Sequence, residues 1–125
     1  MKLGDKEAQV DGVLEWFPIS AQSPHLDITI ECTEFTCRCP VTNQPDWATI
    51  VIEYEPNLRV VESKSVKMYL ETYRDTGVFH EHLAQQMLDD LVKVLEPREC
   101  KVTVHFNTRG GIAISATASY DREEK

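Results

Sequence analysis

The sequence lacks any apolar run long enough to cross a bilayer, which excludes a transmembrane protein. It also lacks an apolar stretch of the signal-peptide type near its N-terminus, so the cytoplasm is the expected compartment. No internal repeat or low-complexity segment divides the chain, and 125 residues fit a single domain, 1–125. Within it we expect residues 1–24 to form a loop-like N-terminal extension and residues 120–125 to form a flexible tail.

Basic residues are scarce, since 13 Lys and Arg stand against 21 Asp and Glu and give a formal net charge of −8. A negative overall field does not draw a chain onto phosphate backbones, so neither nucleic acid nor a membrane is an expected partner. A domain this small builds a modest core and leaves little room for a deep pocket of its own. Sites between subunits are therefore a reasonable expectation.

The hydrophobic pattern predicts four strands and two helices. The predicted strands cover residues 26–32, 47–54, 100–107 and 111–119. The first predicted helix runs over 63–74 with Ser63 as its cap. In the second, Phe79 and Leu83 belong to the apolar face that packs on the core, and the helix ends at Pro97. This order favours an α+β fold, with an antiparallel four-stranded sheet and two helices on one face. Its sheet edges need protection, and pairing between subunits is one solution.

Three of the four cysteines, Cys32, Cys37 and Cys39, lie within eight residues. In a cytosolic chain they are expected to be reduced thiols, so the cluster indicates metal binding, catalysis or packing. A thiol becomes a nucleophile when its pKa is lowered or when a base lies nearby. After Cys39 a Pro-bounded loop leads to Asp46, whose carboxyl can turn back and shuttle protons. The alternative is that the cysteines are packing residues and that Asp46 is a turn residue.

Zinc binding is a competing interpretation of the same cluster. The three thiols together with His80 or His82 would supply four ligands. The spacing C-x4-C-x-C differs from the usual C-x2-C pair, however, and no second cysteine pair follows it. We therefore expect no metal.

Three cations are candidate ligands for an anion. Lys64 and Lys67 share one helix face near the helix N-terminus, where backbone N–H groups also favour an anion. Arg109 precedes two glycines in a predicted turn and adds a guanidinium. The alternatives are a solvated helix face with ion pairs to Glu62 or Glu71, and an ordinary hairpin turn.

His80 and Glu81 flank the apolar stripe at the start of the second helix. A carboxylate there can accept two parallel N–H bonds, as from a guanine-like edge. The alternative is an exposed glutamate of the kind common at helix starts.

Five motifs stand in a fixed order along the chain. They are 14–18 (LEWFP), 34–46 (EFTCRCP, then QPD), 62–69 (ESKSVKMY), 79–81 (FHE) and 109–111 (RGG). Together they resemble the 7-cyano-7-deazaguanine reductases of queuosine biosynthesis, whose signature E-S-K-S-x-K-x-[YF] is the most specific part. The resemblance covers nearly the whole chain.

The resemblance implies the tunnelling fold (ββααββ), assembled into rings with sites between subunits, here a homo-oligomer taken as a decamer of two pentamers. It implies an oxidoreductase that reduces the nitrile of 7-cyano-7-deazaguanine (preQ0) to the amine of 7-aminomethyl-7-deazaguanine (preQ1) in tRNA modification. Because this reduction takes four electrons, two NADPH are consumed per substrate.

The resemblance also assigns roles to residues. Cys39 attacks the nitrile carbon and forms a covalent thioimide, while Asp46 supplies the proton to nitrogen. The substrate-binding residues are Val61, Glu62, Ser63, His80 and Glu81. The residues for the cofactor phosphates are Lys64, Lys67 and Arg109.

Two positions depart from the family pattern. Cys37 adds a second thiol two residues before Cys39. This thiol could compete with Cys39 as the nucleophile or form a strained disulfide with it. We choose Cys39, because its pairing with Pro40 and its spacing to Asp46 match the family. Asn43 replaces a frequent glycine, and asparagine tolerates the left-handed conformation.

Three alternatives remain open at this point. A related amidinotransferase of the same fold uses thioimide chemistry on a nitrile-bearing tRNA, but is expected to lack the lysine signature. A tunnelling-fold pterin enzyme such as a cyclohydrolase needs a metal cage that the histidines do not form convincingly. A non-catalytic binding domain predicts unreactive cysteines and no NADPH binding.

Overall fold

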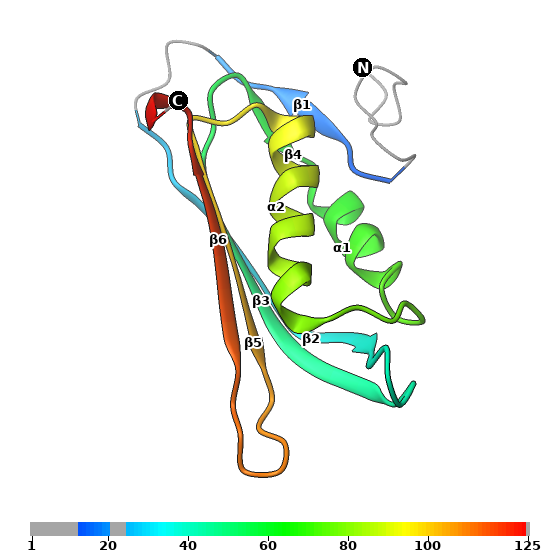
Figure 1. Cartoon of the computed structure of the whole chain (residues 1–125). Helices are drawn as coiled ribbons and strands as arrows, with labels where there is room; N and C mark the ends of the chain where they lie inside the picture. The colour runs from blue at the N-terminus through cyan, green and yellow to red at the C-terminus, as the bar shows by residue number, and fades with distance from the viewer. Residues whose placement is uncertain (1–12, 21–24, 125) are drawn as a thin grey trace.

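A computed structural model describes residues 13–20 and 25–124 and consists of a twisted sheet with two helices on one face (Figure 1). The four strands are antiparallel, in the order β2 (Ile28–Arg38), β3 (Pro45–Glu55), β5 (Glu99–Phe106) and β6 (Ser115–Asp121). The helices are α1 (Ser63–Glu71) and α2 (His80–Leu95). The predicted α+β fold is confirmed. No helix in the described part of the chain is long and apolar enough to cross a membrane.

The core lies between α2 and the sheet. On α2 the side chains of Leu83, Met87 and Leu91 are fully buried, and they face β5 and β6. Burying each such side chain contributes roughly 1.5–3 kcal/mol, so the α2 stripe is a main source of stability. The prediction that Phe79 lies in the core is wrong, because this residue precedes α2 as its N-cap and is 52% exposed.

A second, two-stranded sheet corrects the prediction that residues 1–24 are loop-like. Here β1 (Trp16–Pro18) pairs antiparallel with β4 (Arg59–Val61), whereas residues 1–12 and 21–24 lie outside the described residues. The Arg59 guanidinium lies 4.4 Å from the Trp16 ring centroid and donates to the Val94 carbonyl at 2.9 Å. These contacts join the small sheet to α2.

The β2 strand extends six residues beyond its predicted end at Cys32. A bulge shifts the register between Cys32 and Phe35, so two consecutive polar residues interrupt the alternation and hide the continuation from sequence analysis. Beyond the bulge, Phe35 and Cys37 face the core, and Cys37 pairs with Asp46 of β3. The bulge therefore sets which side chains reach the core at this end of the sheet.

The cap of α1 is Glu62 and not Ser63. The Glu62 carboxylate accepts hydrogen bonds from the backbone N–H groups of Lys64 at 3.0 Å and Ser65 at 2.8 Å. The α-helix also ends three residues before the predicted Arg74, because its last turn tightens into bonds three residues apart. The predicted end of α2 before Pro97 is confirmed.

The hairpin between β5 and β6 turns at Gly110 and Gly111, whose φ angles of 60° and 80° suit a two-residue turn. The predicted turn is confirmed, but β6 begins at Ser115, four residues later than expected. Residues 120–124 belong to the fold instead of forming a tail, since β6 runs to Asp121 and η2 (Arg122–Glu124) follows.

Candidate active site: a thiol loop beside a buried carboxylate

Cys39 begins a tight loop between β2 and β3. Its N–H donates to the Gln44 carbonyl at 2.9 Å, and the Asn43 N–H donates to the Cys39 carbonyl at 2.8 Å. Asn43 has a φ of 62°, which confirms the left-handed conformation expected there. The pKa of the Cys39 thiol is lowered, first by a hydrogen bond from the Thr42 side chain and then by the N–H groups of Thr42 and Val41. These bonds favour the nucleophilic thiolate.

Cys37 has the opposite environment. Its side chain is fully buried, and burial raises its pKa to about 11, with further contributions from the charges of Asp46 and Cys39. Burial likewise raises the pKa of Cys100 to about 12. A buried thiol of raised pKa is a poor nucleophile, so the geometry favours Cys39 over Cys37 as the reactive group.

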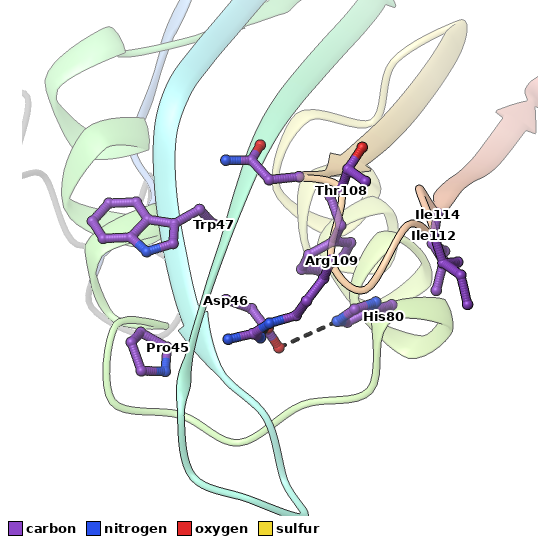
Figure 2. A pocket seen from close by; sticks show the side chains of 10 residues that line it. Pro45, Asp46, Trp47, His80, Thr108, Arg109, Ile112 and Ile114 are labelled. Atoms are coloured by element: carbon purple, nitrogen blue, oxygen red, sulfur yellow. Dashed lines mark hydrogen bonds and ion pairs between the residues drawn. The ribbon is translucent and has the colours of Figure 1, made fainter.

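Asp46 lies at the start of β3 in the core-facing row and is 6% exposed. Its carboxylate lies between Nε2 of His80, at 3.3 Å, and the guanidinium of Arg109, which donates to it (Figure 2). The His80 ring stacks on Phe106 with centroids 3.5 Å apart. The buried carboxylate therefore has a hydrogen-bonding and a charged partner, as a buried charge requires. The charge of Asp46 raises the pKa of Cys39, against the larger lowering by the hydrogen bonds of the turn, so the carboxylate acts on the thiol across the loop.

A cavity of about 430 Å³ opens beside Asp46 (Figure 2). Its walls are Pro45, Asp46, Trp47, His80, Phe106, Asn107, Thr108, Arg109, Ile112 and Ile114. Trp47 is 53% exposed and Ile112 is 63% exposed, so the cavity has an apolar rim. Sequence analysis missed Trp47, Phe106 and Ile112 because no motif marks them. The register of β3 with β5 sets Phe106 opposite Ala48, next to Trp47, and the hairpin that follows β5 carries Ile112.

The lysine pair lies elsewhere in the chain. Lys64 and Lys67 are exposed on α1, but the backbone N–H groups expected to help bind an anion are occupied by the Glu62 carboxylate. The N–H of Val61 is also engaged, by the Tyr54 hydroxyl at 3.0 Å. Any anion bound here would therefore depend on the ammonium groups and not on the helix end. Ser63 is exposed and available at the first position of α1.

A second groove of about 410 Å³ lies between α1 and β2 and includes Ser63 and Lys67 in its walls. Among the described residues, none lines both this groove and the cavity beside Asp46. Arg109, expected beside the lysines, contacts Asp46 instead. Glu81 is exposed in the first turn of α2, next to His80. Within one chain, Asp46 contacts His80 and Arg109, and Cys39 lies in the loop that leads to Asp46. The two lysines lie apart from this group.

The ligands of the zinc alternative are dispersed. Cys32 lines the groove beside α1, Cys37 is buried in the core, and His80 faces Asp46. Within residues 13–20 and 25–124, no three His, Cys, Asp or Glu side chains are grouped so that they could hold a metal ion. The thiol and carboxylate chemistry is the better account of the cluster.

The fold and the site define an α+β protein with a candidate thiol nucleophile beside a buried carboxylate. Comparison with known proteins places this arrangement in a family. The model of the QueF-like protein family matches residues 45–125. The chain is 57% identical over 122 residues to the NADPH-dependent 7-cyano-7-deazaguanine reductase of Frankia casuarinae, covering 98% of this chain and 96% of that one. It is 49% identical over 114 residues to the reductase of that name from Helicobacter pylori, covering 90% and 76%.

The chain belongs to the QueF family of NADPH-dependent 7-cyano-7-deazaguanine reductases. Among solved structures, it is similar to the archaeosine synthase QueF-Like in the apo form, with a TM-score of 0.68 and 24% identity. The alignment covers 78% of this chain and 95% of that one. This likeness supports the fold alone.

Proposed function

We propose that this chain reduces 7-cyano-7-deazaguanine to 7-aminomethyl-7-deazaguanine in queuosine biosynthesis, through a covalent thioimide on Cys39. Relatives that bear the reductase name match nearly the whole chain at up to 57% identity. The observation that carries the mechanism is that a thiol of lowered pKa begins a closed loop whose other end leads directly into the buried carboxylate of Asp46. The chemistry of a nitrile, electrophilic at carbon and basic at nitrogen, matches that pair.

In the first step, the Cys39 sulfur attacks the nitrile carbon. A C–S bond forms, one π bond of the nitrile opens, and the Asp46 carboxylate takes the thiol proton and passes it to the nitrogen. The product is a thioimide, which accepts a hydride far more readily than a free nitrile. His80 holds one oxygen of Asp46 from a ring that is itself fixed on Phe106, so the carboxyl is presented in a defined orientation.

The residues present fit a polyanionic cofactor. Lys64 and Lys67 offer two exposed ammonium groups one turn apart on α1, and ammonium and guanidinium groups are the usual phosphate ligands. When bound, NADPH supplies a hydride to the substrate carbon, and two molecules are needed in turn. Arg109 contacts Asp46 in this structure, so it would have to leave Asp46 before it could serve as the third phosphate ligand.

Cys39 then acts as a leaving group. After the first reduction its sulfur departs as a thiolate, the C–S bond breaks, and the imine remains for the second reduction. The hydrogen bonds from Thr42 and Val41 that lower the pKa of Cys39 also stabilise this departing thiolate. The thiol is therefore regenerated, and the overall reaction consumes two hydrides and two protons.

Recognition of the deazaguanine edge would fall to Glu81, with His80 and the backbone of Val61, Glu62 and Ser63. His80 lines the cavity beside Asp46, whereas residues 61–63 and the lysines do not, so a complete site needs a neighbouring subunit. A homo-oligomer of stacked rings, a decamer of two pentamers, would supply it. Among the described residues, β2 and β6 are the outermost strands of the sheet, so their outer edges are the places for such pairing.

The test is intact-protein mass spectrometry after incubation with 7-cyano-7-deazaguanine without NADPH. The wild type should gain the substrate's mass at Cys39, the Cys39→Ala variant should gain nothing, and NADPH should then discharge the adduct as the amine. An adduct that NADPH leaves unchanged would indicate the amidinotransferase instead. Absence of any adduct would favour a non-catalytic binding domain.

A further inference from the structure

The side chain of Arg38 reaches across the Cys39 loop. Its Nη1 donates to the Asn43 carbonyl at 3.0 Å, on the far side of the loop. Its Nη2 lies 3.4 Å from the Asp75 carboxylate, a partly exposed pair that adds little by itself. Because the loop is also closed by the Cys39 N–H on the Gln44 carbonyl, Arg38 provides a second closure around the same turn.

The backbone of Arg38 is bound to the connector between the two helices, residues 75–78. The Arg38 N–H donates to the Thr76 carbonyl at 2.9 Å, and the Val78 N–H donates to the Arg38 carbonyl at 3.1 Å. These bonds form a parallel bridge with Gly77. The end of β2 is therefore joined to the segment that leads directly into His80.

Close packing reinforces this bridge at Pro40, the residue after the nucleophile. A Cβ added at Gly77 would lie 3.2 Å from the Pro40 Cα, which is tighter than an ordinary contact between such atoms. The close approach depends on the missing side chain of Gly77, since the opposing atom belongs to the backbone. The connector thus packs against the Cys39 loop at Pro40, and the Arg38 side chain bonds both to that loop and to the connector.

We propose that Arg38 and Gly77 are positioning residues that set the place of the Cys39 thiol relative to His80 and Asp46. The proposal rests on the function proposed above. Cys39 follows Arg38 directly, and His80 lies two residues beyond Val78, so the bridge fixes nucleophile and recognition segment at a common point. The role is geometric, because the bonds that lower the pKa of Cys39 come from Thr42 and Val41 and not from Arg38.

The first test compares Arg38→Met with Arg38→Lys. Methionine keeps the apolar stem and removes every donor, so thioimide formation in a single turnover should slow by about tenfold to a hundredfold, as small misplacements of reacting groups do. Lysine keeps one donor and should recover most of the rate. The KM for the nitrile should stay within about threefold, and the pH midpoint of Cys39 alkylation, located by peptide mass, should stay at the wild-type value.

Gly77→Ala tests the same positioning role without changing any charge. The added methyl group must displace the Pro40 backbone, so this variant should also slow thioimide formation while leaving the alkylation midpoint unchanged. Arg98→Gln is the matched control, since Arg98 is exposed and is bonded through its backbone to Glu55, far along β3 from the loop. It should react at the wild-type rate.

The outcomes separate the two proposals. If the wild type forms no adduct, the proposed function fails and the positioning role fails with it. If the wild type forms the adduct and Arg38→Met matches its rate, only the positioning role is overturned. A higher pH midpoint of Cys39 alkylation in Arg38→Met would also overturn the positioning role, because the arginine would then act on the charge of the thiolate. Circular dichroism and melting temperature must stay near wild type in Arg38→Lys, which keeps the comparison valid if Arg38→Met folds poorly.

Discussion

At the scale of single residues, two thiols two positions apart have opposite chemical characters. Cys37 faces the core, where burial penalises its thiolate, whereas Cys39 has just left the strand and receives hydrogen bonds from the turn. The end of β2 at Arg38 determines this difference, because two residues spaced by two would face the same side of a strand and only Cys37 lies within it. Reactivity at this site is thus a result of strand geometry as much as of residue type.

The hydrogen bond from Thr42 gives a prediction about pH. Removing it in Thr42→Val should raise the pKa of the Cys39 thiol, so less thiolate is present at any pH below that pKa. Alkylation of Cys39 by iodoacetamide should slow severalfold at neutral pH, and its midpoint should move to higher pH. Thr42→Ser, which keeps the hydroxyl, is the control. An unchanged midpoint in Thr42→Val would contradict this account of the lowered pKa.

Replacing Cys37 should affect stability and not chemistry. Cys37→Ala removes a fully buried sulfur, which should lower the free energy of unfolding by about 1–2 kcal/mol. NADPH consumption with the nitrile should continue at a rate near that of the wild type, as measured by absorbance. Loss of turnover in a folded Cys37→Ala protein would show that the second thiol takes part in the reaction.

At the scale of elements, hydrophobic periodicity predicted the helices and strands because most of them bury one regular face. The prediction failed where local chemistry interrupts the period. The β2 bulge hid the strand's second half, and β1 is three residues long, too short for any alternation to register. The cap of α1 was assigned to Ser63 because serine is the commoner cap residue, whereas the adjacent Glu62 makes the bonds.

The site was predictable only in part, for a related reason. Cys39 and Asp46 lie on either side of one short loop, so their proximity in the sequence indicated that they could act together. The contacts of Asp46 with His80 and Arg109 join residues 34 and 63 positions away, and they follow from sheet register and hairpin placement. Arg109 was expected beside the lysines because its motif indicates a role and does not reveal where the residue lies in the fold.

The cap gives a prediction for α1. In Glu62→Ala the N–H groups of Lys64 and Ser65 lose their acceptor, so the free energy of unfolding should fall by about 0.5–2 kcal/mol. Urea denaturation at fixed protein concentration measures this change. Glu71→Ala, at the other end of the helix, removes an exposed carboxylate and should cost less than about 0.5 kcal/mol. Equal losses in the two variants would show that capping is not the cause.

At the scale of the whole molecule, the helices cover one sheet face, and β2 and β6 are the outermost strands of the sheet within the described residues. The acidic chain carries its exposed lysine pair on α1, away from the cavity that holds Asp46. If the lysines hold the cofactor and Cys39 is the nucleophile, as proposed, this separation predicts that a single copy of the chain is an incomplete enzyme.

Assembly is therefore a direct prediction. Size-exclusion chromatography with light scattering should give a mass about ten times that of one chain, which corresponds to two stacked pentamers. Dilution that dissociates the assembly should abolish NADPH consumption in parallel, since the site would lose the neighbouring subunit. A fully active protein with the mass of a single chain would contradict the shared site.

The central claim is that this chain carries out a four-electron reduction through Cys39. The most direct measurement is the loss of NADPH absorbance when a limiting, known amount of 7-cyano-7-deazaguanine is added to the wild type and to Cys39→Ala. The account predicts two NADPH consumed per nitrile by the wild type and none by the variant. Consumption by Cys39→Ala, or no consumption by the wild type, would contradict it.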